Sequence, residues 1–126
     1  MPLEYSKRLI EEFRNPSNVG EMEAPDGFAT HSSDECGDYL ELYLRVEDGR
    51  IRDAKFKTFG CAAAIASSSM LTRMAIGKTL DEALQITEKD VIQALEGMPE
   101  AKVHCSLLAV EALKKAVEDY RNKNPG

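Results

Sequence analysis

The residues of this sequence best suited to chemistry are three cysteines, one aspartate and one histidine. They stand in three separate segments, which contain Cys36 and Asp38, then Cys61, then His104 and Cys105. Each cysteine is next to turn-forming or helix-starting residues, and none occupies the middle of an apolar stripe. A single cysteine is most often a small buried apolar side chain. That interpretation fits three cysteines at such junctions less well, so we consider the five residues together as a candidate site.

These residue types allow metal binding or nucleophilic thiol chemistry. Cys61 and Cys105 are predicted at helix N-termini, where the dipole favours the thiolate and makes it a better ligand and nucleophile. Three thiolates and an imidazole match the Cys₃His set of some zinc sites, and a carboxylate is a further donor. The chain has no Cys-x-x-Cys pair, so its spacing leaves a metal site and a redox or nucleophilic thiol both open. Only their cysteine neighbours distinguish His104 from an ordinary surface histidine and Asp38 from an acid at a strand start.

The first half of the chain predicts one helix and a small antiparallel sheet. Apolar residues recur at helical spacing in Tyr5–Arg14. A loop-rich stretch follows, with a short edge strand near Gly27–His31. Apolar and polar residues alternate through Leu40–Val46, and the turn signal Asp48-Gly49 returns the chain into a second strand, Ile51–Phe59.

The second half predicts four helices. The first is rich in small residues and covers Ala62–Ile76. Capping boxes at Thr79 and Thr87 open two short helices, and the last helix covers about Cys105–Tyr120. The fold class is therefore predicted as α+β, a three-stranded antiparallel sheet packed against about five helices.

Composition narrows the functional class. The 126 residues, of mass 14.0 kDa, indicate a single domain over residues 1–126. A net charge of −6 argues against a general nucleic-acid binder. No apolar run approaches the ~18 residues of a membrane span, and the N-terminus lacks a secretory pattern. An odd count of three cysteines is typical of thiols kept reduced, which predicts a cytoplasmic protein.

Several longer motifs, taken together, resemble the IscU family, which also occurs as the N-terminal domain of NifU and serves as the scaffold for iron–sulfur cluster assembly. The resemblance covers nearly the whole chain. Its motifs are Tyr5-Ser6-Lys7 with Asn15-Pro16-Ser17-Asn18-Val19-Gly20, Cys36-Gly37-Asp38, Gly60-Cys61-Ala62-Ala63-Ala64-Ile65-Ala66-Ser67-Ser68-Ser69, and Lys102-Val103-His104-Cys105-Ser106 with Leu108-Ala109.

The resemblance implies a scaffold and sulfur acceptor rather than a catalyst. A two-iron, two-sulfur cluster would be held at one end of the fold by Cys36, Cys61 and Cys105, with Asp38 or His104 as the fourth ligand. Cys105 is the expected persulfide acceptor. The implied partners are a cysteine desulfurase, an electron donor such as a ferredoxin, and acceptor apo-proteins.

Three further features bear on partners. The segment Met98–Lys102 resembles the family's Leu-Pro-Pro-Val-Lys chaperone-docking motif, but Glu100 replaces the second proline, which argues against dependence on the dedicated chaperone pair. Lys102 either tunes the thiolates or is an ordinary exposed lysine. Tyr5 resembles the tyrosine through which family members contact a second copy, as in a homodimer, and the alternative is that it packs on its own domain.

Two other functions stay open. One is a zinc-dependent sulfur-transfer protein like the SufU branch, with the same residues on zinc. That branch typically carries an insertion between the second and third cysteine motifs and lacks the histidine before the third. This chain keeps His104 and shows no obvious insertion, which favours the scaffold. The other is a structural zinc module, which would unfold when the metal is removed.

Overall fold

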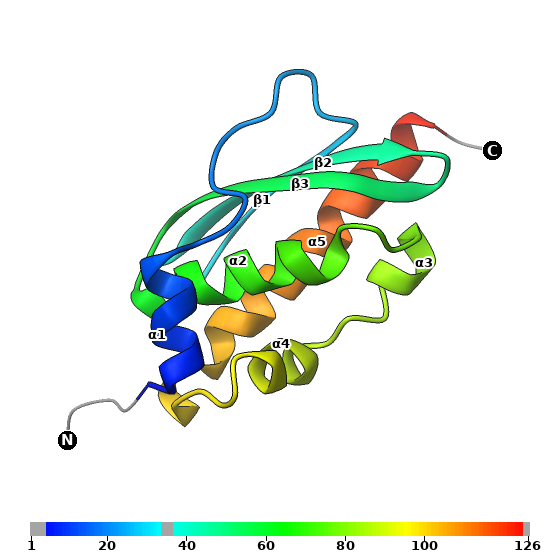
Figure 1. Cartoon of the computed structure of the whole chain (residues 1–126). Helices are drawn as coiled ribbons and strands as arrows, with labels where there is room; N and C mark the ends of the chain where they lie inside the picture. The colour runs from blue at the N-terminus through cyan, green and yellow to red at the C-terminus, as the bar shows by residue number, and fades with distance from the viewer. Residues whose placement is uncertain (1–4, 34–36, 125–126) are drawn as a thin grey trace.

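The computed structural model describes residues 5–33 and 37–124 and has the predicted α+β architecture (Figure 1). Three strands form one antiparallel sheet in the order β1-β2-β3, and the helices lie on one side of it. The elements are α1 (Lys7–Arg14), β1 (Gly27–Ser32), β2 (Tyr39–Glu47), β3 (Arg50–Phe59), α2 (Ala62–Ala75), α3 (Leu80–Ala83), α4 (Glu88–Ala94), the 3₁₀ turn η1 (Glu100–Lys102) and α5 (Val103–Lys123).

A tight turn between β2 and β3 sets the register of the sheet. Asp48 and Gly49 both have positive φ, 54° and 75°, as a type I′ hairpin turn requires. Because the strands are antiparallel, Tyr39 at the start of β2 pairs with Phe59 at the end of β3. The residue before β2 and the residues after β3 therefore meet at the same end of the sheet.

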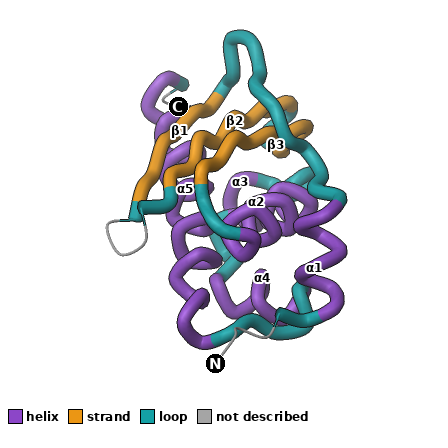
Figure 2. The backbone as a smooth tube through the Cα atoms, turned by 90° about the vertical axis from the view of Figure 1, so that its left-hand side faces the viewer, coloured by secondary structure: helices purple, strands orange, loops and turns teal. Residues whose placement is uncertain are grey.

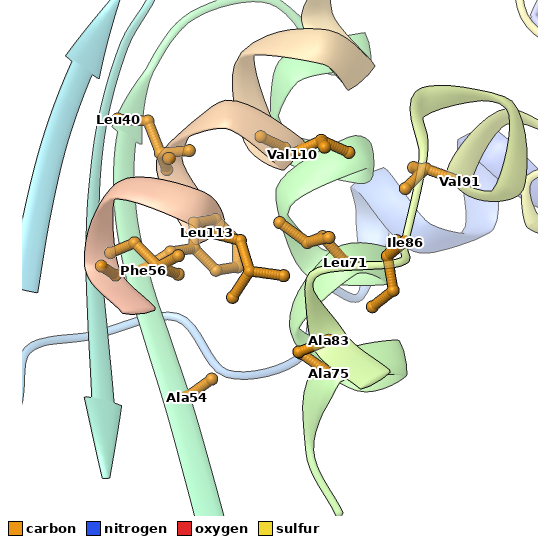
Figure 3. Close-up of a cluster of buried hydrophobic side chains, with 14 of the residues drawn as sticks. Leu40, Ala54, Phe56, Leu71, Ala75, Ala83, Ile86, Val91, Val110 and Leu113 are labelled. Carbon is orange, nitrogen blue, oxygen red and sulfur yellow. The ribbon is translucent and has the colours of Figure 1, made fainter. Parts of the chain in front are cut away.

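Two long helices, α2 and α5, cover the inner face of the sheet (Figure 2). Their small residues allow close packing, and the backbone of α5 at Ala116 lies so near β1 that a Cβ on Gly27 would come within 2.5 Å of the carbonyl oxygen. The side chains that Figure 3 labels are all buried and belong to one hydrophobic cluster that extends from the sheet through the helices packed on it: Leu40, Ala54, Phe56, Leu71, Ala75, Ala83, Ile86, Val91, Val110 and Leu113.

Helix α1 is attached to α2 through a charged side chain rather than an apolar stripe. Glu12 is only 1% exposed and accepts a hydrogen bond from Ser69 on α2 at 2.5 Å. Of the apolar residues behind the helix prediction, Leu9 is buried while Ile10 and Phe13 are exposed. Ser6 caps the helix by accepting from the Leu9 amide, so α1 begins at Lys7 and not at Tyr5.

The later helices follow their predicted signals. Both capping boxes are present, at Thr79 before α3 and at Thr87 before α4. Helix α5 begins at Val103 and not at Cys105, because η1 leads directly into it, and Cys105 is therefore in its first turn. Within residues 5–33 and 37–124, no helix is long and apolar enough to cross a membrane.

Candidate metal and thiol site

Three segments bring metal-binding side chains to one end of the molecule. Asp38 immediately precedes β2, Cys61 follows β3 and is the N-cap residue of α2, and Cys105 lies in the first turn of α5. The pairing of Tyr39 with Phe59 brings the first two segments together. The packing of α5 against α2 and the sheet adds the third.

The donor atoms of Asp38, Cys61 and Cys105 lie within 4.8 Å of one another. The two thiol sulfurs are 3.7 Å apart. The Cys105 thiol also donates to Oδ2 of Asp38 at 3.4 Å. Two soft sulfur donors and one hard oxygen donor therefore face a common point.

The site is partly shielded from water, and its two thiols differ in accessibility. Cys105 is 1% exposed and Asp38 is 3% exposed, whereas Cys61 is half-buried. Burial is the main reason that the pKa of Cys105 is raised well above its ordinary value, and the adjacent Cys61 thiol and Asp38 carboxylate raise it further. Without a bound cation, Cys105 is therefore held as the thiol that donates to Asp38, and Cys61 is the more accessible sulfur.

Helix N-termini contribute positive potential to the site. Neither α2 nor α5 has a side-chain hydrogen bond at its N-cap residue, which is Cys61 in α2 and Lys102 in α5. The dipole of each helix favours negative charge at its start. At Cys105 burial and the neighbouring Cys61 and Asp38 outweigh this effect and raise the pKa, so the prediction that its position at a helix start favours the thiolate is wrong for the metal-free protein.

Small apolar side chains surround the buried thiol. Ala63 and Ala64 pack with Cys105, and Tyr5 and Met98 pack against this cluster from outside together with Cys61. Tyr5 is half-buried in this position, as expected for the alternative in which it packs on its own domain. Apolar walls lower the local dielectric and limit the access of water to the sulfurs.

Two predicted ligands remain, His104 and Cys36, and the structure describes only the first of them. His104 is half-buried, and its Nε2 lies 3.7 Å from the Cys105 sulfur, so a nitrogen donor is adjacent to the thiols. Cys36 lies outside the described residues. Residues two apart on one strand point the same way, so Cys36 and Asp38 would share a face if the strand already began at Cys36. That condition is not met, because β2 begins at Tyr39 and Asp38 reaches the site from the loop before it.

One residue that contacts the site was missed by sequence reasoning. Gly60 directly follows the predicted strand Ile51–Phe59 and belongs to the second cysteine motif, but no role at the site was predicted for it. In the structure it lies against Asp38, and a Cβ at this position would be 2.7 Å from Asp38 Oδ1. Its position directly before a cysteine was the available signal, but a glycine that ends a strand gives the same pattern.

This arrangement suits a metal or cluster that needs thiolates and must also be released. Thiolates are the preferred ligands of iron–sulfur clusters and bind zinc well. A carboxylate is a harder donor and is exchanged more readily. The donor set of Asp38, Cys61 and Cys105, with His104 beside it, therefore fits either iron or zinc.

Comparison with known proteins assigns the family. Residues 4–125 match the family model described as the NifU-like N-terminal domain. The iron–sulfur cluster assembly scaffold protein IscU 1 of Archaeoglobus fulgidus is 53% identical over 95% of this chain and 78% of its own length. IscU of Escherichia coli K12 is 45% identical over 94% of this chain and 95% of its own length.

Solved structures agree with this assignment. The N-terminal NifU-like protein of Brucella abortus has a TM-score of 0.80 and 26% identity, covering 94% of each chain. A putative scaffold for the SUF system from Fervidobacterium islandicum has a TM-score of 0.75 and 25% identity, covering 90% of this chain and 96% of that one. The chain belongs to the family of NifU-like N-terminal domains.

Proposed function

We propose that this protein is a scaffold on which an iron–sulfur cluster is assembled before transfer to acceptor apo-proteins. The observation that carries the proposal is the convergence of Asp38, Cys61 and Cys105 within 4.8 Å at a partly buried point. The names of the relatives in Archaeoglobus and Escherichia support it. In this role the cluster is a product to be passed on, and the protein itself is not a catalyst.

The proposed product is a two-iron, two-sulfur cluster held by Cys36, Cys61 and Cys105, with Asp38 or His104 completing the ligand set. Its sulfur would come from a cysteine desulfurase, whose persulfide passes its outer sulfur to Cys105. The desulfurase thiol is regenerated as the Cys105 persulfide forms, so this transfer consumes no electrons. Two electrons, from a donor such as a ferredoxin, and two protons then convert the persulfide into a thiol and sulfide.

The burial of Cys105 sets a condition on this sulfur transfer. Its thiol is 1% exposed and donates to Asp38, so the site must open before an incoming persulfide can reach it. Cys61 is half-buried and its sulfur is 3.7 Å away. Cys61 can therefore receive the sulfur first and pass it to Cys105 by the same exchange.

Asp38 is proposed as the labile ligand that keeps the cluster transferable. Its carboxylate is a harder donor than a thiolate, and protons, solvent or an acceptor's cysteine displace it more readily. We expect Asp38→Ala to assemble a cluster that is lost more slowly and passes more slowly to an apo-ferredoxin. The anaerobic decay of visible absorbance, with and without acceptor, measures both rates. Equal rates in Asp38→Ala and wild type would exclude the labile-ligand role.

Partners and compartment follow from the same proposal. The proposed partners are the desulfurase, the electron donor and the acceptors, and Glu100 in place of a docking proline in Met98–Lys102 argues against dependence on the dedicated chaperone pair. Lys102 is half-buried at the start of α5, where a positive charge favours thiolates. Three thiols that must stay reduced indicate the cytoplasm.

The test is anaerobic reconstitution with iron, cysteine and a desulfurase. Wild type should gain the visible absorption of an iron–sulfur cluster, with equal amounts of iron and sulfide. The single variants Cys36→Ser, Cys61→Ser and Cys105→Ser should each lose it, because a missing thiolate leaves an iron site open. Three serine variants that all hold a cluster as well as wild type would refute a shared site.

A zinc-dependent sulfur-transfer protein is the second candidate. The donor set also fits Zn²⁺, and a putative SUF-system scaffold shares the fold at 25% identity. Protein that stays colourless in the same reconstitution, with one bound zinc, would favour this function. Unfolding on removal of the zinc would instead indicate a structural module.

A further inference from the structure

The Asp38 carboxylate occupies the space that a side chain at Gly60 would need. A Cβ at this position would lie 2.7 Å from Oδ1 and 3.0 Å from Cγ of Asp38. It would also lie 3.0 Å from the Cβ of Ala64 in the first turn of α2. Contacts below 3.0 Å are not tolerated by real side chains, so any residue larger than glycine requires a shift.

The carboxylate has little freedom to make that shift. Asp38 is a short side chain, and the Asp38 carbonyl oxygen accepts a hydrogen bond from the Ser33 amide at 2.9 Å, which ties down its backbone. Its other oxygen, Oδ2, accepts from the Cys105 thiol at 3.4 Å. Rotation away from Gly60 would therefore move the oxygen away from the sulfurs.

We infer that Gly60 is a positioning residue for the candidate site. Because glycine has no side chain, there is room next to it for the Asp38 carboxylate. The carboxylate lies in this space, between the end of β3 and Cys105. Gly60 is not in the left-handed region, so its backbone conformation does not itself require glycine. The requirement comes from close approach, and the residue acts only through Asp38. What the carboxylate does for a cluster rests on the proposed function.

Cobalt binding tests the inference without a cluster. Co²⁺ reports thiolate ligands through its charge-transfer absorption and the ligand geometry through its visible bands. Gly60→Ala should keep the charge-transfer absorption, because both thiols remain, and should bind Co²⁺ about 10-fold more weakly. That is the low end of the 10–100-fold losses seen when ligand orientation is lost.

A double-mutant cycle isolates the contact with Asp38. Asp38→Ala removes the two Asp38 atoms that a Cβ at Gly60 would meet and leaves only the 3.0 Å contact with Ala64, which offers no ligand atom. Adding Gly60→Ala to Asp38→Ala should therefore change Co²⁺ affinity by less than about 2-fold. If Gly60→Ala weakens binding equally in both backgrounds, the residue does not act through Asp38 and the inference is wrong. Wild-type affinity in Gly60→Ala overturns it as well.

Stability provides the matched control. Gly27→Ala introduces a comparable clash, 2.5 Å from the Ala116 carbonyl oxygen, far from the site. It should lower the melting temperature and leave Co²⁺ affinity unchanged. If Gly60→Ala fails to fold, the double variant with Asp38→Ala should fold and recover most of the lost stability, because only the 3.0 Å contact with Ala64 remains. Continued failure to fold would show that the clash is not with Asp38.

Cluster assembly separates this inference from the proposed function. If wild type forms no cluster, the proposed function fails, and the cobalt cycle still decides whether Gly60 positions Asp38. Suppose that wild type forms a cluster, that Asp38→Ala loses it more slowly, and that Gly60→Ala loses it as quickly as wild type. The positioning role of Gly60 would then be wrong, while the proposed function would stand. We expect Gly60→Ala to share the slower loss of Asp38→Ala.

Discussion

Replacing Glu12 with alanine should detach α1 from α2 and lower the free energy of unfolding substantially. The Glu12 carboxylate is 1% exposed and accepts from the Ser69 hydroxyl at 2.5 Å. It also pairs with Arg8 at 2.8 Å and with Arg73 at 3.3 Å. Helix α1 holds Tyr5 next to the buried Cys105, so this network also supports one wall of the candidate site.

The loss of stability in Glu12→Ala depends on which hydrogen-bond and ion-pair partners of Glu12 can be hydrated once the carboxylate is gone. Removing one member of a fully buried ion pair costs about 3–5 kcal/mol. Arg8 and Arg73 are 25% and 48% exposed and can be hydrated, whereas the Ser69 hydroxyl is buried and would lose its acceptor, at about 1–3 kcal/mol. We therefore expect a loss of about 3 kcal/mol. With about 2.1 cal/mol/K of unfolding entropy per residue over 126 residues, this lowers the melting temperature by about 11 °C.

Urea and thermal unfolding of wild type, Glu12→Ala and Glu11→Ala measure this effect. Glu11 is on the same helix but exposed, so its replacement should change stability by no more than about 0.5 kcal/mol. If Glu12→Ala costs no more than the Glu11 control, the buried network does not hold α1 in place. The reasoning would then be refuted.

Two further predictions concern a hydrogen bond on the sheet and the chaperone segment. Tyr43 donates to Glu41 at 2.7 Å, and this bond is the main reason that the pKa of Glu41 lies below its ordinary value of 4.5. Because the pKa of Glu41 is lower in the folded than in the unfolded protein, its ionised carboxylate stabilises the fold at pH values above the ordinary pKa. This stabilisation is lost as the pH falls through the pKa of Glu41 in the folded protein. In urea unfolding, Tyr43→Phe should thus destabilise the protein at about pH 7, and the loss should shrink as the pH falls through the lowered native pKa of Glu41. A loss that stays the same over the whole acid range would contradict this. Glu100→Pro should strengthen binding to a chaperone that recognises Leu-Pro-Pro-Val-Lys, because it removes a charge, and proline suits the first residue of η1. Identical calorimetric titrations would exclude Glu100 as the cause of weak binding.

The structure changes the physical argument for Glu100. Proline at this position could favour docking by holding an extended segment, but Glu100–Lys102 forms a 3₁₀ turn that leads into α5. Proline fits both states, since its fixed φ is compatible with the first residue of a helical turn. The exposed carboxylate of Glu100 is therefore the more direct reason to expect weak docking.

Most of the secondary structure could be predicted because its signals are local. The Asp48-Gly49 turn, the alternation in Leu40–Val46 and the capping boxes at Thr79 and Thr87 each act over a few neighbouring residues. Helix starts were less accurate. The Ser6 cap moved the start of α1, and η1 moved the start of α5, by about two residues each, as is usual for helix ends.

The sequence by itself thus determined the α+β class, the hairpin and the choice of candidate residues, which are Cys36, Asp38, Cys61, His104 and Cys105. Only the tertiary structure decided that Asp38 accepts a hydrogen bond from the Cys105 thiol, 67 positions away, and that Gly60 leaves room for it. Contacts of this kind depend on strand register and on how helices pack over the sheet. The amino-acid sequence specifies the type and order of these residues. The distances between their side chains are set only when separate helices and strands pack together in one core.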